Sequence, residues 1–560
     1  MVPRMKLKSA RLFALAIISC TAVFADEPPP VERAIPDAVK SLAAPPAAGV
    51  APGGRRIAVS AATEAAQHHF NLGMAYLNAG WDFEASRHFA AAMTEDPDCL
   101  LAHWGMVLCL IDPGPETLAA RDAALERLLV LVENGAGTEL ERGYAYGLIK
   151  YIQEGPAAAA EAYGKVSARF PNELQAALLA TLFGRGGFDP EGNPNPTQES
   201  SENALRALMA KHPGNPVPQH ALLFIRAEGA MSGEFLAIAR GLALQWPDFP
   251  PYQHMLGHYE WRAGNHAQAN AAFGLAAALY RKWMDAQDVG FADCPEWLKS
   301  RCYQIVVLHS MGETEAALAA AGELAAIALD PERPASRGNR FLMWEAKTLP
   351  ARLMMCQAKG NARKAAATLP KPADLAPFRD HSLAYLWIDG LRLLLEVRGL
   401  LDDGKPDAAR EAQNALVHHG ELMARTRNAA QSGGEISPWS RAFRGMEILA
   451  SELRGDIALA GGDAIRASAF NWFSAAADRQ SPASLLMPPA VLTPMAGRLG
   501  DFLLAEKKPA EAIDAYRRAL NLLPNNLDLL TSLERALRQA DRIEEATETT
   551  RQIEALKAVN

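Results

Sequence analysis

Apolar side chains recur along this chain at the spacing of an α-helix, and the pattern is clearest between residues 70 and 97. The large apolar residues of this stretch are Leu72, Tyr76 and Phe89. The small residues in the same frame are Gly73, Ala85 and Ala92. Large side chains would fill the space between two helices, while small ones would let the helix axes approach to about 8–10 Å. The stretch therefore predicts a tightly packed helix pair.

Two helix breakers divide this stretch into a helical hairpin. Gly80 can adopt the left-handed conformation that ends a helix. Pro97 follows the second helix and stops it. No strand-rich segment with alternating apolar and polar residues is present in the sequence. The sequence therefore predicts an all-α chain.

The hairpin pattern recurs along the chain. One clear copy consists of Leu256, Gly257, Ala269, Phe273 and Ala276, and another consists of Leu499, Gly500, Ala512, Tyr516, Ala519 and Pro524. Three degenerate copies each keep a glycine at the turn: Gly312, Gly404 and Gly462. The pattern resembles the tetratricopeptide repeat (TPR), a hairpin of about 34 residues that stacks into a superhelix. The resemblance implies a TPR-type α-solenoid of about ten helix pairs, although each weak copy could be an antiparallel hairpin of another type.

Composition divides the chain into four parts. Residues 1–25 have a basic start, an apolar run and small residues before Ala25, as a secretory signal does. Residues 26–60 are rich in proline and alanine, which predicts a disordered tether. Residues 61–430 are expected to form the N-terminal part of the solenoid, and residues 431–560 are expected to add C-terminal TPR-like repeats to it.

The leader leaves two routes of processing open. Cleavage after Ala25 would release a protein into the periplasm or cell envelope. Ile17-Ile18-Ser19-Cys20 also resembles a lipobox, so Cys20 could instead carry a lipid anchor. The apolar run of the leader is too short for a spanning helix of about 20 residues. We expect export in both cases, and no transmembrane span in the mature chain.

Charge and cysteine content narrow the possible partners. The chain has 56 basic and 64 acidic residues and no basic run beyond the leader, so we expect no nucleic-acid partner. Five cysteines follow the leader, an odd number without a C-x-x-C motif, which gives no support to a zinc or haem site. A disulfide between Cys294 and Cys302 stays open.

Catalytic motifs are absent from the sequence, which predicts a protein that is not an enzyme and has no cofactor. His254 and His258 lie four residues apart on one face of a predicted helix, where two imidazoles can share a metal ion. No carboxylate nearby offers an obvious third ligand, so no metal site is assigned. A metal-dependent enzyme or small-ligand binder that uses the His254/His258 face is the alternative hypothesis.

Three further segments resemble a group of exported bacterial TPR proteins related to tetratricopeptide repeat protein 38. Residues 96–105 match a D-P-x-C-x-x-A-x-W-G block, and residues 254–264 are similar to an H-M-P-x-H-x-x-x-R-x-G segment. Near the end, Pro488 and Pro489 keep the frame of a third block. Apolar residues replace its polar positions: Leu485, Met487, Val491 and Ala496. These residues are expected to pack at a helix junction.

The resemblance implies an exported helical repeat protein, and repeat solenoids present concave binding surfaces. We expect a non-catalytic scaffold or assembly factor that binds a protein or peptide in its concave groove. The expected groove residues are on the first helices of repeats: Trp104, His254, His258 and Trp261.

Overall fold

The computed structural model describes residues 35–43, 51–53, 57–189, 191–357, 360–429 and 433–559. The expected leader, residues 1–25, and Cys20 lie outside these ranges. Within them the chain is helical, and its β-structure is one isolated bridge between Phe188 and Pro194. The prediction of an all-α, TPR-like solenoid is confirmed. No helix of the described ranges combines the length and the apolar character that crossing a bilayer requires.

The helices of the first half are α2 (Asp37–Lys40), α3 (Glu64–Asn78), α4 (Asp82–Glu95), α5 (Leu100–Cys109), α6 (Leu118–Glu133), α7 (Glu139–Glu154), α8 (Pro156–Arg169), α9 (Leu174–Gly184), α10 (Pro196–Lys211), α11 (Pro216–Arg226), α12 (Gly233–Gln245), α13 (Pro250–Arg262) and α14 (His266–Gln287).

The helices of the second half are α15 (Glu296–Ser310), α16 (Thr314–Ala326), α17 (Arg337–Phe341), the π-helical turn η1 (Leu342–Ala346), α18 (Leu349–Met355), α19 (Ala362–Thr368), α20 (Pro372–Leu375), the 3-10 turn η2 (Ala376–Phe378), α21 (Ala384–Asp402), α22 (Pro406–Ala429), α23 (Ile436–Ala460), α24 (Asp463–Arg466), α25 (Ala469–Arg479), α26 (Met495–Ala505), α27 (Pro509–Leu522), α28 (Leu527–Gln539) and α29 (Ile543–Val559).

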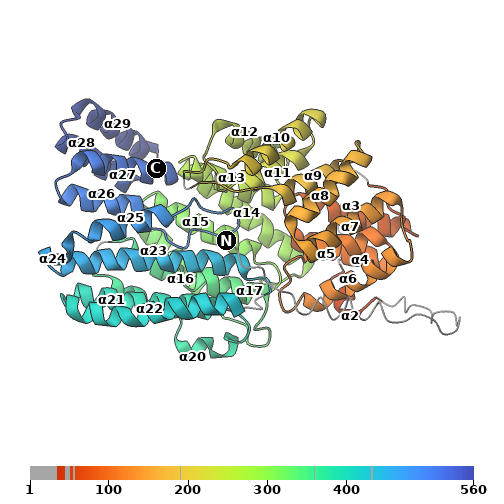
Figure 1. Ribbon diagram of the computed structural model, residues 1–560, viewed down its shortest axis with the longest axis horizontal. Helices are drawn as coiled ribbons and strands as arrows, with labels where there is room; N and C mark the ends of the chain where they lie inside the picture. Colours follow the sequence, from red (N-terminus) through yellow and green to blue (C-terminus); the bar gives the residue numbers. More distant parts are fainter. Residues whose placement is uncertain are drawn as a thin grey trace.

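Consecutive helices pack as hairpins, and the hairpins stack side by side (Figure 1). The array continues across the predicted boundary at residue 430, because α21 and α22 both pack against α23. In Figure 1 the helices α3–α9 lie at one end of the molecule and α21–α29 at the other, with α13–α15 between them.

Glycines set the approach of the two helices in each clear repeat. A Cβ atom at Gly73 would lie 2.8 Å from the ring of Phe89, and one at Gly257 would lie 2.8 Å from Phe273. The same atom at Gly500 would lie 2.7 Å from the ring of Tyr516. Because heavy atoms cannot approach this closely without a shift, only glycine fits these positions without repacking. The predicted role of the small residues is confirmed by this contact.

Left-handed glycines end the first helices of several hairpins. Gly80 has φ 79° after α3, and Gly264 has φ 81° after α13. Glycine adopts this conformation at no steric cost, because it has no Cβ atom. The turn that the sequence predicts at Gly80 is therefore present.

The solenoid winds far enough for distant turns to meet. The backbone N–H of Gly434 donates to Asp112 Oδ1 at 2.8 Å, across 322 positions of sequence. The side chain of Asn525 donates to the carbonyl oxygen of Gly264 at 3.1 Å, across 261 positions. The loops that join hairpins thus close the superhelix upon itself.

Part of the predicted tether departs from the expectation of disorder. The short helix α2 lies within residues 26–60, and Val39 on it is completely buried. Ile35 and Ala51 are buried with it in the N-terminal apolar core. Apolar residues spaced among prolines were sufficient to pack against α4 and α6. The tether prediction is therefore wrong for residues 35–43 and 51–53.

Two glycines inside helices, Gly73 and Gly164, give a matched test of the close helix approach. Gly73→Ala should lower the unfolding midpoint, because the new methyl group overpacks against Phe89 at a cost of about 1–3 kcal/mol. A Cβ atom at Gly164 in α8 would meet no atom within 4 Å. Gly164→Ala should therefore stabilise the helix by roughly 0.5–1 kcal/mol and raise the unfolding midpoint slightly. Thermal unfolding followed by circular dichroism measures both. Equal shifts for the two variants would contradict the packing described here.

Candidate binding site along the inner wall

An irregular segment runs through the interior of the superhelix. We call this segment, Gln480–Pro494 between α25 and α26, the strap. It contains no charged residue and four prolines. Besides Pro488, five apolar side chains of the strap are buried: Leu485, Met487, Ala490, Val491 and Leu492. Leu485 belongs to the N-terminal apolar core and the other four to the C-terminal core, so the strap joins the two.

Side chains on α13 and α15 donate hydrogen bonds to main-chain carbonyls of the strap. Nε2 of His254 donates to the carbonyl of Leu485 at 2.9 Å. The hydroxyl of Tyr303 contacts the carbonyls of Met487, at 2.7 Å, and of Ser484. The ring of Tyr303 is held by stacking on Phe273, with ring centroids 5.0 Å apart. These donors bind main-chain carbonyls of the strap and not its side chains.

Two arginines extend the same arrangement to the proline pair of the strap. Arg441, on α23, donates through Nη1 to the carbonyl of Pro488 at 2.5 Å. Arg352, on α18, donates through Nη2 to the carbonyl of Pro489. Between the two guanidinium groups lies the carboxylate of Glu345, which is 0% exposed. Its Oε2 accepts from Arg352 at 2.9 Å, and its Oε1 pairs with Arg441.

Burial lowers the pKa of both Arg352 and Arg441 to about 10, so both remain charged near neutral pH. Two buried cations need a buried counter-charge, since removing one partner of such a group typically costs about 3–5 kcal/mol. Glu345 supplies that charge from the π-helical turn η1. Single π-turns are frequent at functional sites, because they redirect side chains that an α-helix would place elsewhere.

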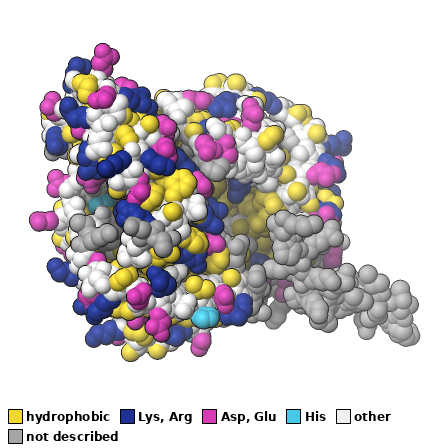
Figure 2. All heavy atoms as spheres, turned by 60° about the vertical axis from the view of Figure 1, so that its left-hand side comes forward, with side chains coloured by type: hydrophobic (Ala, Val, Ile, Leu, Met, Phe, Trp, Pro, Cys, Tyr) yellow, Lys and Arg dark blue, Asp and Glu magenta, His cyan; other side chains and the backbone are white. Residues whose placement is uncertain are grey.

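Three hollows border the strap, which lines the first through Thr493 and the other two through longer stretches. The largest, of about 820 Å³, we call the charged hollow. It shares four lining residues with a second hollow of about 200 Å³: Cys356, Thr493, Arg498 and Asp501. The second hollow shares a stretch of the strap with a third, of about 210 Å³. The hollows are therefore contiguous, and Figure 2 shows a recess near the middle of one face in which hydrophobic side chains gather.

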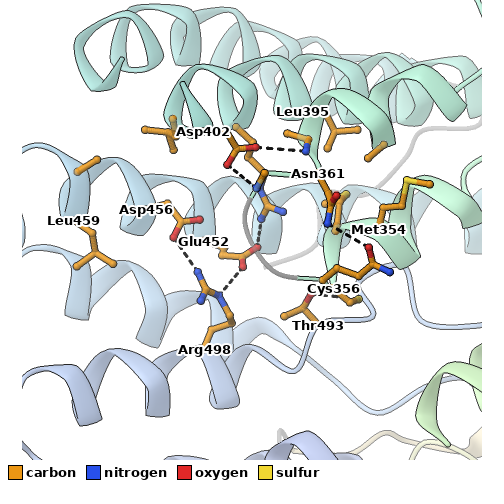
Figure 3. A pocket seen from close by; sticks show the side chains of 18 of the residues that line it. Met354, Cys356, Asn361, Leu395, Asp402, Glu452, Asp456, Leu459, Thr493 and Arg498 are labelled. Carbon is orange, nitrogen blue, oxygen red and sulfur yellow. Dashed lines mark hydrogen bonds and ion pairs between the residues drawn. The ribbon is translucent and has the colours of Figure 1, made fainter. Parts of the chain in front are cut away.

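The floor of the charged hollow is a small ionic network (Figure 3). Glu452 on α23 pairs with Arg398 on α21 and accepts from Arg498 Nε on α26 at 3.0 Å. Arg498 also donates to Asp456 at 2.9 Å. Burial alone would raise the pKa of Glu452, but the attraction of the two arginines outweighs it and lowers that pKa. Apolar residues form the walls above this floor: Met354, Leu395, Leu401 and Leu459.

The structure places three of the four predicted groove residues on α13 and the fourth elsewhere. His254, His258 and Trp261 lie on α13, whereas Trp104 lies on α5. Trp104 is 1% exposed and donates from Nε1 to Tyr163 Oη at 3.1 Å. Trp261 is 3% exposed and donates to Ser310 at 3.1 Å, although it also lines the second hollow.

The prediction that these four side chains form an open groove surface is wrong, because all four are buried. The pattern of apolar residues predicted that these side chains line the inner face of the first helices. It did not show that the chain itself covers this face. His254 contacts the strap, so the wall that was expected to receive a guest holds a segment of its own chain along this part.

The two histidines are engaged by protein atoms. Nε2 of His258 donates to the carbonyl of Ala227 at 3.0 Å. Burial lowers the pKa of His254 to about 4 and of His258 to about 3, so both rings are neutral near pH 7. A neutral ring that donates from Nε2 has its free lone pair on Nδ1, and in His254 that atom lies 3.0 Å from Ser300 Oγ. Among the described residues, no group of three or more His, Cys, Asp or Glu side chains could hold a metal ion.

The cysteines of the described chain are free thiols, including Cys294 and Cys302. Burial raises the pKa of the Cys302 thiol to about 12, which suppresses the reactive thiolate. The disulfide that the sequence left open is therefore not formed.

Sequence reasoning missed the residues that hold the strap: Tyr303, Glu345, Arg352 and Arg441. The available signal was the proline pair, which stood in the third block of the family resemblance. The apolar residues of that block were expected to pack at a helix junction, and they do: Leu485, Met487, Val491 and Ala496 are buried.

Comparisons with known proteins assign neither an activity nor a partner to this chain. No protein-family model matches the chain, and no curated protein matches it. Solved structures that are similar include the TPR domain of P58(IPK), with 13% identity, 85% of this chain and 98% of that chain covered, and a TM-score of 0.19. The Cut9–Hcn1 heterotetramer of APC/C gives 13% identity, coverage of 88% of both chains and a TM-score of 0.24.

Yeast Tom70 gives 11% identity, coverage of 88% of this chain and 93% of that chain, and a TM-score of 0.25. Scores this low carry no conclusion about activity or partners. The similarity to the group of tetratricopeptide repeat protein 38 finds no support in these comparisons and stays a prediction.

Proposed function

We propose that this chain is a non-catalytic scaffold that binds a segment of another polypeptide along its inner wall. One observation carries the proposal: the wall already holds an irregular segment of polypeptide through hydrogen bonds to its main-chain carbonyls. The donors come from α13, α15, α18 and α23, so the binding surface is distributed over stacked hairpins. Distributed surfaces of this kind suit an elongated ligand.

The charged hollow is the part of the wall at which a partner segment can enter. Its apolar walls and ionic floor combine the two features that binding sites need, which are area for burial and fixed polar groups for orientation. It opens to Asp402 and Ala460, which are both exposed, and it continues into the second hollow. A side chain of a partner can therefore enter beside the strap.

No observation favours the alternative of a metal-dependent enzyme or small-ligand binder on the His254/His258 face. Both rings are buried, and each Nε2 atom is committed to a main-chain carbonyl. A metal ion at this face would have to bind through the Nδ1 atoms, and that of His254 already lies 3.0 Å from Ser300 Oγ.

Binding by the charged hollow can be tested by site-specific photo-crosslinking in the cells that encode the chain. Benzoyl-phenylalanine at Ala460, which is exposed and lines the hollow, should form adducts with a discrete polypeptide. The matched control is Lys165 on α8, which is exposed and lines none of the hollows described above. Adducts of equal yield from both positions, or no polypeptide adduct from position 460, would contradict the proposal.

We also propose that the scaffold acts in the cell envelope as an assembly factor, after removal of residues 1–25. The basic and apolar leader supports this location. Mass spectrometry of the mature protein should find a free N-terminus at Asp26. An acylated Cys20 at the N-terminus would contradict cleavage after Ala25 and would show a lipid anchor. An intact Met1 on the protein from its native host would contradict export.

A further inference from the structure

One buried arginine of the inner wall has no counter-charge. Resting on the function proposed above, we propose that Arg262 binds the C-terminal carboxylate of the partner segment, and that the last side chain of that segment occupies the second hollow. The observations that carry this inference are the unpaired cation, the apolar walls beside it and the charges at the edge of the hollow. The arginines of the charged hollow, by contrast, already have carboxylate partners.

Four arginine side chains are buried in the part of the chain that the structure describes, and Arg262 differs from the other three. Each of the three pairs with a buried glutamate: Arg87 with Glu84, Arg340 with Glu435 and Arg352 with Glu345. Arg262 is 4% exposed, and its Nη1 donates to the carbonyl oxygen of Ala227 at 2.6 Å. Among the described residues, no carboxylate forms an ion pair with it.

The charge of Arg262 is only partly offset by its surroundings. Burial lowers the pKa of the guanidinium group, but arginine stays protonated in proteins at neutral pH. The carbonyl of Ala227 and the carbonyl end of α13 supply partial charges. Glu228 acts from the third hollow, and its carboxylate is attracted more strongly by Arg444 than by Arg262. Since a buried charge requires a full counter-charge, a carboxylate from outside the chain would complete this site.

The second hollow gives access to Arg262, which lines it. Apolar side chains form its walls, among them Val306, Leu492 and Leu529. The last residue of a polypeptide carries a carboxylate and a side chain on one carbon atom, so an apolar residue at this position can meet the cation and the walls together. An acidic side chain within a segment would supply the carboxylate but would leave the apolar walls uncovered. A chain end with an apolar side chain therefore fits this hollow best.

The edge of the second hollow limits the charge of the partner. Asp501 and Asp528 line the hollow and are exposed, and Asp501 accepts from the hydroxyl of Tyr516 at 2.8 Å. Two negative charges here oppose a segment rich in acidic residues and favour one carboxylate on a neutral or basic segment. Because the second hollow is contiguous with the charged hollow, a segment that enters through the charged hollow can end at Arg262.

The test uses N-acetyl-leucine as a minimal chain end and measures its dissociation constant on the purified protein by saturation-transfer difference NMR. N-acetyl-leucinamide lacks the carboxylate and should bind about tenfold more weakly, because a hydrogen bond to a charged group is lost. N-acetylglutamic acid α-amide carries its carboxylate on the side chain only. It should also bind about tenfold more weakly, because the leucine side chain is missing from the apolar walls.

Two variants separate binding from stability. Arg262→Met should remove the preference for the acid over the amide and should leave the unfolding midpoint unchanged or raise it, because an unpaired buried charge is lost. The matched variant Arg340→Met removes an equally buried arginine but leaves Glu435 without its partner, so it should lower the midpoint. A midpoint lowered as much by Arg262→Met as by Arg340→Met would show that Arg262 is a structural residue and would overturn the inference.

The binding data can overturn the inference as well. Equal affinity for the acid and the amide would do so, as would the absence of N-acetyl-leucine binding. Equal or tighter binding of the glutamic acid amide would replace the chain end by an acidic side chain. Crosslinking at position 460 samples the charged hollow and is independent of these probes. A polypeptide adduct without a preference for the acid would keep the proposed function alone, and the reverse result would leave a carboxylate site without a polypeptide partner.

Discussion

The carboxylate of Glu345 is the group on which the interior of this molecule depends. It neutralises two buried guanidinium groups, and these reach the carbonyls of Pro488 and Pro489 from different helices. A buried charge without a partner is costly, so the two arginines and the glutamate must be buried together. Their burial requires that α18, α23 and the strap meet at one place. The ionic group thereby fixes the path of a segment that has no regular structure of its own.

The path of the strap in turn explains why the solenoid is closed where an open groove was expected. Leu485 packs in the N-terminal apolar core, and Met487, Val491 and Leu492 pack in the C-terminal core. Burial of such side chains contributes about 1.5–3 kcal/mol each. A superhelix of hairpins has contacts mainly between neighbours in sequence. Here the strap adds contacts across the superhelix and connects its two ends from the inside.

The sequence predicts the local architecture well, because that architecture depends on spacing within a single repeat. The contact between Gly73 and Phe89 follows from a pattern of about 34 residues, and so does the turn at Gly80. These features involve residues that are close in the chain and side chains whose size can be read directly.

The covering of that wall could not be predicted, for two physical reasons. The contact between His254 and Leu485 spans 231 positions, and no periodic pattern specifies it. The helices also contact the strap through its main-chain carbonyls, which every residue has. No side-chain motif in the sequence of the strap therefore predicts which residues it contacts. The burial of Glu345 and its two arginines could not be predicted either, because charged residues in a helix are ordinarily solvated.

Hydrogen–deuterium exchange tests most directly whether the strap holds the interior together. Glu345→Gln removes the counter-charge of both arginines and changes no apolar contact. The account predicts faster exchange in the strap and in α13, α15, α18 and α23, while α7 and α8 remain as protected as in the wild-type chain. Faster exchange confined to η1, with an unchanged strap, would contradict it.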